Sequence, residues 1–249
     1  MNGRQYNIYA TLLNGFSDYL NSNAIYEAYW GFSEYPSKSA EEFEQGQFQS
    51  LIDRINRVPF DSEAADRGTA FNEVVDCIIL HQKSDKMDIV SNKDAGSITA
   101  RYNVREFTFP ISLCREFADY YKGAIPQVYA EAVLHTSRGD VKLYGYIDEL
   151  MPHSVHDIKT TSKYAVGKYR NGWQHVVYPY CLNANGCEVA LFEYNIAEMG
   201  KYNTATYTET YNYNPDIEVP RLIDICERFI EFLESNRHLI TDLKIFNQA

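Results

Sequence analysis

The sequence predicts one α/β domain with a helical N-terminal part. Helix-like apolar periodicity covers much of residues 8–83, and strand-like alternation dominates residues 127–162. No repeat, low-complexity linker or sharp composition shift divides the 249 residues, so a single domain is expected over 1–249. Its expected parts are a helical stretch at 1–60, a core at 61–215 and a C-terminal helix at 216–249.

Three helical patterns are expected in the first 83 residues, two in the N-terminal part and one at the start of the core. Residues 8–30 indicate one or two amphipathic helices with a break near Asn21–Asn23. Residues 40–58 indicate a second helical segment, for which Ser39 is a plausible N-cap. Residues 62–83 form a third, with an apolar face directed to the core.

The middle of the chain changes to mixed patterns. Residues 84–98 are polar and predict a loop, and residues 98–109 alternate weakly, as in a strand. Residues 110–123 predict a helix with Pro110 near its first turn and Gly123 past its end.

Three strands in a meander are expected next, at 127–137, 140–150 and 154–162. A helix is expected at about 165–184, kinked or interrupted by Pro179. The remaining elements are expected to be strands at 187–198 and 204–214 and a closing helix at 216–240.

Composition excludes several classes of function. A net charge of −11 and a pI near 5.0 argue against broad electrostatic adhesion to nucleic acid or to anionic membranes. The five cysteines lack any C-x-x-C pair, so free thiols are expected and not a disulfide framework, zinc ribbon or iron–sulfur cluster. No signal peptide or membrane-spanning run is visible, which predicts an intracellular protein without a membrane partner.

The candidate site lies on the second and third strands of the meander. Side chains alternate faces along a strand, so a hairpin brings Asp148, Asp157 and Lys159 together. Two carboxylates on adjacent strands can hold Mg²⁺ or Mn²⁺, and the backbone carbonyl of Ile158 is placed to join them. Lys159 would orient a water or stabilise developing negative charge, which suits phosphodiester hydrolysis.

Neighbouring residues favour a site over a solvated ion pair. Gly145, three residues before Asp148, leaves room for a close approach of backbone or ligand. Gln174 and Tyr178 follow at i, i+4 spacing on the expected helix, so they share a face.

These motifs together resemble a known family. The pattern G-Y-I-D-x8-D-I-K-T followed by Q-H-V-V-Y is similar to the PD-(D/E)xK nuclease superfamily, in its RecB-like branch, to which the lambda-exonuclease group is related. The stretch Arg67–Asn72 resembles the upstream R-G-x-x-x-H or R-G-x-x-x-E helix of that branch. Over about residues 60–200, the resemblance implies a restriction-endonuclease-like core with a mixed central β-sheet flanked by helices.

The resemblance also implies roles for single residues. Asp148 and Asp157 correspond to the metal-binding acids and Lys159 to the catalytic lysine. Gln174 corresponds to an active-site residue that, with Tyr178, positions nucleic acid. Two further nucleic-acid contacts are expected at Thr160 and at Arg170, which would lie one helical turn before Gln174.

Asn72 departs from the family pattern, which has histidine or glutamate there. Asparagine offers a carbonyl oxygen to a hard cation but no charge. Whether a second metal binds, and whether the protein is catalytically active, therefore both stay open. Glu73, Asp76 and Glu131 are alternative acids for the site.

The resulting expectation is a Mg²⁺- or Mn²⁺-dependent deoxyribonuclease, an exonuclease more than a site-specific endonuclease. The family implies DNA recombination, repair or phage DNA processing in the cytoplasm of a bacterial or phage-infected cell, with RNA as an alternative substrate. The second hypothesis is a catalytically weak or inactive nuclease-fold subunit that binds DNA or a partner protein. Because the chain is acidic, a partner protein or a ring-like homo-oligomer is expected to retain it on DNA.

Overall fold

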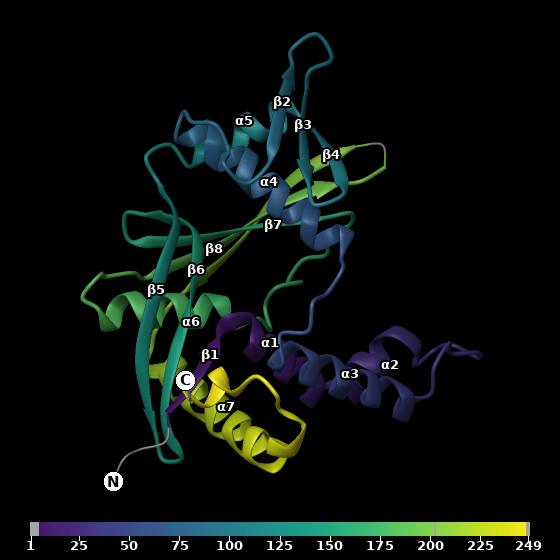
Figure 1. Cartoon of the computed structure of the whole chain (residues 1–249), viewed down its shortest axis with the longest axis vertical. Coiled ribbons are helices and arrows are strands. Elements are labelled where there is room, and N and C mark those ends of the chain that lie inside the picture. Colours follow the sequence, from purple (N-terminus) through teal and green to yellow (C-terminus); the bar gives the residue numbers. More distant parts are fainter. Residues whose placement is uncertain (1–4, 202, 248–249) are drawn as a thin grey trace.

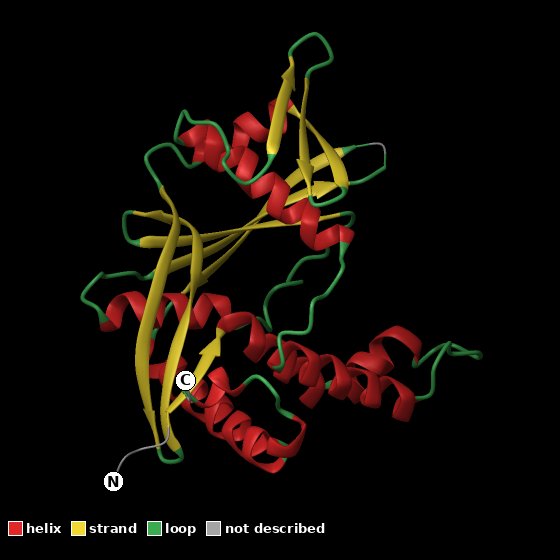
Figure 2. Cartoon of the chain, in the orientation of Figure 1, coloured by secondary structure: helices red, strands yellow, loops and turns green. Residues whose placement is uncertain are grey.

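The computed structural model describes residues 5–201 and 203–247 as an α/β fold with a mixed six-stranded sheet flanked by helices (Figures 1 and 2). This confirms the predicted fold class. The main sheet comprises β1 (Gln5–Tyr9), β5 (Ile125–Thr136), β6 (Gly139–Met151), β7 (Ser154–Thr161), β8 (Leu191–Met199) and β9 (Thr204–Asn212). A three-stranded sheet comprises β2 (Asp88–Asn92), β3 (Ser97–Tyr102) and β4 (Arg105–Pro110). The helices are α1 (Ala10–Leu20), α2 (Ser22–Trp30), α3 (Ala40–Ile55), α4 (Glu63–Ile79), α5 (Ile111–Tyr120), α6 (Gln174–Ala184) and α7 (Pro215–Ser235), with short 3₁₀ turns at Arg237–Leu239 and Leu243–Phe246.

Strand β6 organises the main sheet. Along one edge it pairs with antiparallel β5, and along the other it pairs first with parallel β1 and then with antiparallel β7. The β7 ladder is short, because it joins only Glu149–Met151 to Ser154–His156. Residues 145–148 of β6 therefore lie between two partners, and β7 leaves β6 to pair in parallel with β8. This opening places Asp148 beside the middle of β7.

Each face of the sheet has its own hydrophobic core. The larger core contains residues of α1, α3, α6 and α7 with one set of strand side chains, including Tyr194. The smaller core contains residues of α4, α5, β3 and β4 together with Ile158. Figure 1 shows α4, α5 and the small sheet on one side of the main sheet and α1, α6 and α7 on the other.

Several predicted helix boundaries are confirmed. Asn21 separates α1 from α2. Ser39 caps α3 through a capping box, in which its hydroxyl accepts the Glu42 N–H at 3.1 Å and the Glu42 carboxylate accepts the Ser39 N–H at 2.8 Å. Ser62 caps α4 by accepting the Ala65 N–H.

Other element predictions were wrong. Residues 5–9 form β1, which pairs with a strand distant in sequence, so its local pattern carried little signal. The expected loop at 84–98 contains β2 and the start of β3, and residues 98–109 form a β3–β4 hairpin that turns at Asn103, where φ is +52°.

The helix expected from 165 begins only at Gln174, and it continues through Pro179 instead of ending there. Arg170 consequently lies outside the helix and is not one turn before Gln174 on a shared face. In the described part of the chain, every helix is too short or too polar to cross a bilayer.

Candidate functional site

Asp157, Lys159 and Gln174 form a connected group between β7 and the first turn of α6. The Lys159 ammonium lies 2.5 Å from Asp157 Oδ2 and donates to Gln174 Oε1 at 2.9 Å. The Gln174 amide in turn donates a short hydrogen bond to Asp157 Oδ1. Asp157 is 2% exposed and Gln174 5%, whereas the Lys159 side chain is 25% exposed, so a buried carboxylate and amide meet an ammonium that water can still reach.

Asp148 reaches the same place from β6. Its Oδ2 accepts the backbone N–H of Ile158 at 2.8 Å, across the opening where β7 has separated from β6. The N–H and C=O of one strand residue point to the same side, so the Ile158 carbonyl also faces Asp148 and not β8. The predicted convergence of Asp148 with the D-I-K strand is therefore present, through Asp148 and the Ile158 backbone.

The Asp148 carboxyl group is harder to ionise than usual, because the positive charge near it does not balance the negative charge of Asp148 and Asp157 together. Burial and repulsion from Asp157 raise its pKa to about 7, although Lys159 and hydrogen bonds from the Ile158 N–H and the Asn72 amide act in the opposite direction. One ammonium thus serves two carboxylates. A divalent cation would remove this repulsion.

Asn72 is on α4, and its side chain meets Asp148. Its Oδ1 is buried and has no hydrogen-bond partner among residues 5–201 and 203–247. An orphaned buried oxygen on a side chain that meets the Asp148 carboxylate fits a hard cation, which prefers oxygen ligands. No group of three or more His, Cys, Asp or Glu side chains suited to a metal occurs in the described residues, so a cation here would depend on the neutral oxygens of Asn72 and Ile158 as well as on the two acids.

The three alternative acids lie elsewhere. Glu131 forms an ion pair with Lys142 at 2.6 Å on the exposed side of β5 and β6. Glu73 is bound by Lys86 at 2.7 Å, which lowers its pKa against the effect of burial. Asp76 faces Glu149 instead of Asp148.

Asp76 and Glu149 form a second buried acidic pair that sequence reasoning did not find. Glu149 is fully buried, and among residues 5–201 and 203–247 both of its carboxylate oxygens and Asp76 Oδ1 lack hydrogen-bond partners. Burial and mutual repulsion raise the pKa of Glu149 to about 9, and burial raises that of Asp76 to about 6. Gln127 of β5, where φ is +55° and no ladder partner on β6 is formed, donates to Asp76 at 3.2 Å.

Glu149→Gln is expected to reduce the loss of stability at alkaline pH. Glu149 takes up a proton on folding between pH 4.5 and about 9, so the free energy of unfolding falls as pH rises through that window. Glutamine needs no proton and can donate to Asp76, which should raise stability at pH 8.5 by about 1–3 kcal/mol. Urea denaturation at pH 6 and 8.5 in EDTA measures this, with exposed Glu188→Gln as the control. Equal pH dependence in wild type and Glu149→Gln would contradict it.

Gly145 and Tyr178 connect β6 to α6. A Cβ on Gly145 would lie 2.7 Å from Tyr178 Cε1 and 2.9 Å from its hydroxyl oxygen. The close approach expected at Gly145 is thus made by the ring of Tyr178, which is 5% exposed. Thr160 lies beside Gly68 near the start of α4, where its hydroxyl is 3.5 Å from the position of a Cβ.

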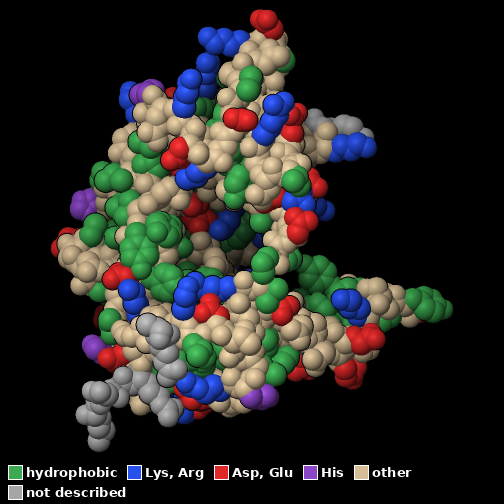
Figure 3. Space-filling model, in the orientation of Figure 1, with side chains coloured by type: hydrophobic (Ala, Val, Ile, Leu, Met, Phe, Trp, Pro, Cys, Tyr) green, Lys and Arg blue, Asp and Glu red, His purple; other side chains and the backbone are tan. Residues whose placement is uncertain are grey.

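The start of α6 is fixed by contacts that no local motif indicated. The Trp173 N–H donates to Asn14 Oδ1 at 2.7 Å, and the Trp173 indole N–H donates to Ser17 at 2.7 Å. Helix α1 therefore positions the residue directly before Gln174. The face of the molecule seen in Figure 3, which has the orientation of Figure 1, is hollowed near its middle, with acidic and basic side chains inside the hollow.

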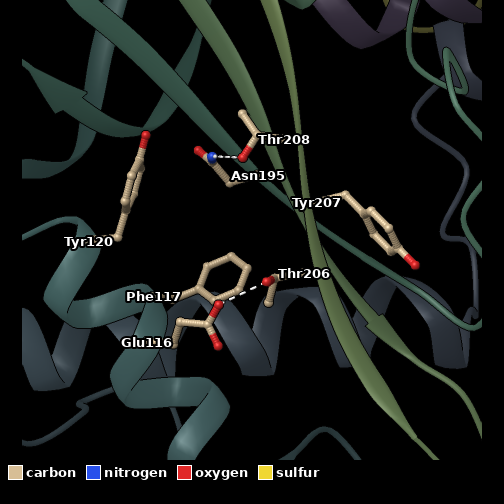
Figure 4. Close-up of a pocket in the computed structure, with 7 residues that line it drawn as sticks. All are labelled: Glu116, Phe117, Tyr120, Asn195, Thr206, Tyr207 and Thr208. Carbon is tan, nitrogen blue, oxygen red and sulfur yellow. Dashed lines mark hydrogen bonds between the residues drawn. The ribbon is translucent and has the colours of Figure 1, made fainter.

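A separate pocket of about 210 Å³ lies between α5 and the β8–β9 strands (Figure 4). Glu116 and Thr206 join across it with a hydrogen bond of 2.8 Å, and Asn195 donates to Thr208 at 3.2 Å. Asn195 is in register with Ile158, whose side chain belongs to the smaller core, so this pocket is on the opposite face of the sheet from Asp157.

Comparisons with known proteins add little. No protein-family model and no curated protein matches the chain. A structure described as "Crystal structure of SSO0001" is similar to this chain with a TM-score of 0.43 and 12% sequence identity, over 91% of this chain and 76% of that one.

Proposed function

We propose that this protein is a metal-dependent nuclease that hydrolyses phosphodiester bonds in DNA. The observation that carries the proposal is the buried Asp157–Lys159–Gln174 group with Asp148 beside it. Two acids, one ammonium and no nucleophilic serine or cysteine suit hydrolysis by water. The motif resemblance to RecB-like nucleases supports DNA as the substrate and favours exonucleolytic action.

The oxygens of Asp148, Asp157, Asn72 and the Ile158 carbonyl would hold the cation. When bound, Mg²⁺ or Mn²⁺ supplies Lewis-acid stabilisation of phosphoryl charge and lowers the pKa of a coordinated water. The donor set is all oxygen, as these hard cations prefer. The orphaned Asn72 Oδ1 and the raised pKa of Asp148 support this assignment.

Lys159 and Gln174 would supply the rest of the chemistry. An ammonium has three donors, of which Asp157 and Gln174 occupy two, so the third is free for a water or a phosphate oxygen. Gln174 has no charge to contribute, but its amide fixes Asp157 and its carbonyl fixes Lys159. Tyr178 sets the position of α6 against β6.

The decisive experiment combines hydrolysis with metal binding. Purified protein is expected to degrade linear DNA with Mn²⁺ or Mg²⁺ and to stop in EDTA, and comparison with closed circular DNA separates exonuclease from endonuclease action. Calorimetry should detect Mn²⁺ binding that Asp148→Asn removes. DNA degradation that persists in EDTA would sink the proposal.

The neutral Asn72 favours a second candidate, a nuclease-fold subunit that binds DNA or a partner protein without cutting. Absence of Mn²⁺ binding in calorimetry, together with intact folding, would favour this candidate. With a net charge of −11, either form is expected to need a partner protein or self-assembly for retention on DNA.

Asn72→Asp is expected to tighten Mn²⁺ binding by about tenfold, equivalent to roughly 1.4 kcal/mol. The substitution keeps the side-chain size and replaces a neutral ligand by a charged one. Calorimetric titration measures the change, and Asn212→Asp, at an exposed residue at the end of β9 and far from Asp148 in sequence, controls for net charge. An unchanged dissociation constant would show that Asn72 does not contact the cation.

A further inference from the structure

We infer that the segment joining β7 to α6, residues 162–173, binds the phosphate backbone of the nucleic-acid strand that enters the site. This inference rests on the proposed function and names the surface that holds its substrate. The segment begins after Thr161, two residues beyond Lys159, and ends at Trp173, directly before Gln174. It therefore connects two members of the buried catalytic group.

Charge sets this segment apart. It contains Lys163, Lys168 and Arg170 and none of the chain's 34 Asp and Glu residues, in a protein whose net charge is −11. All three side chains are exposed. Across residues 5–201 and 203–247, no ion pair involves any of them, whereas many other lysines and arginines of the chain are paired with acids. Unpaired cations next to a phosphodiester-cleaving site are suited to phosphate contacts.

Aromatic residues of the segment hold it in place. Tyr164 donates to Glu209 at 2.8 Å and packs against Tyr207 in a tilted arrangement, with ring centroids 4.6 Å apart. Tyr169 packs against Tyr194 at 5.1 Å, and Trp173 is bound to α1 as described above. The cations are thus presented from a fixed backbone, which limits the entropy lost on binding.

The three cations differ in their own contacts. The Lys168 ammonium turns back to Thr161 Oγ1 at 2.8 Å and to the Lys163 carbonyl at 3.3 Å, so it also stabilises the loop. No side-chain hydrogen bond is formed by the Lys163 ammonium or the Arg170 guanidinium within the described ranges. Lys163 and Arg170 are therefore the cations free to meet phosphates, and they can be removed without breaking a loop contact.

The test is the salt dependence of binding to a labelled single-stranded oligonucleotide, followed by fluorescence anisotropy in EDTA. All proteins carry Asp157→Asn so that the probe stays intact. The logarithm of the association constant falls as the logarithm of the salt concentration rises. Removing two phosphate contacts with Lys163→Ala and Arg170→Ala is expected to make this slope less steep by about 1.4, and to weaken binding equally for different base sequences. The matched control is Lys93→Ala with Lys122→Ala, two exposed lysines outside the segment.

Three outcomes would each overturn the inference. The slope could be unchanged in Lys163→Ala/Arg170→Ala, it could decrease equally in the Lys93→Ala/Lys122→Ala control, or the Asp157→Asn protein without further changes could fail to bind the oligonucleotide. Calorimetric Mn²⁺ titration separates this outcome from failure of the proposed function. If Lys163→Ala/Arg170→Ala binds Mn²⁺ normally in the otherwise wild-type protein but leaves the slope unchanged in the Asp157→Asn background, only the inference about the segment fails. If the wild type binds no Mn²⁺, the proposed function fails whatever the slope.

Discussion

Lys159→Ala is expected to lower kcat for DNA hydrolysis by about 10²–10³-fold while leaving Mn²⁺ binding in place. In the proposed mechanism the Lys159 ammonium would contribute a positive charge and a hydrogen-bond donor at the reacting phosphate, and removing one such group typically costs this much. Asp157→Asn should behave differently, because it removes a proposed metal ligand as well as the partner of Lys159. That variant should lose hydrolysis and weaken Mn²⁺ binding together.

Lys159→Ala and Asp157→Asn are compared by initial rates of DNA hydrolysis under saturating Mn²⁺ and by calorimetric titration of each variant with Mn²⁺. Lys142→Ala is a suitable control, because it removes a lysine that pairs with Glu131 on the exposed side of the sheet. Thermal unfolding shows whether each variant is folded. Lys159→Ala with wild-type rates would remove Lys159 from the proposed chemistry, and loss of Mn²⁺ binding in that variant would assign it to the metal site instead.

Gly145→Ala is expected to destabilise the protein by about 1–3 kcal/mol and to reduce hydrolysis. The new methyl group would lie 2.7 Å from a ring carbon of Tyr178, so either the ring or α6 must move. Movement of α6 displaces Gln174, and with it the bridge between Asp157 and Lys159. Urea denaturation gives the stability change, and the rate assay gives the effect on the site.

A double-mutant cycle identifies the cause. If the clash with Tyr178 is responsible, Gly145→Ala should cost less stability in a Tyr178→Leu background than in the wild type. Gly46→Ala is the matched control, since Gly46 lies within α3 and nothing is within 4 Å of a Cβ there. It is expected to raise stability by up to about 1 kcal/mol through helix propensity. Equal costs of Gly145→Ala in both backgrounds would exclude Tyr178 as the cause.

Much of the fold and most of the central site follow from local sequence. Alternation identifies the three strands of the meander and places Asp157 and Lys159 on one face, because a strand's geometry fixes which side chains share a face. Ser39 with Glu42 marks the start of α3, because a capping box is made by residues three apart. The i, i+4 spacing of Gln174 and Tyr178 is likewise local, and both residues face the sheet in the structure.

What the sequence by itself could not determine depends on contacts between distant segments. The start of α6 is set by Asn14 and Ser17 of α1, so the helical pattern before Gln174 gave a helix too long. The pairing of β1 with β6 opens the gap in which Asp148 meets the Ile158 N–H. Asp76 and Glu149 face each other only because α4 packs on the sheet. Sequence alone therefore determined the chemical groups of the site, whereas the tertiary structure decided which of them meet, because burial and long-range register are properties of the whole chain.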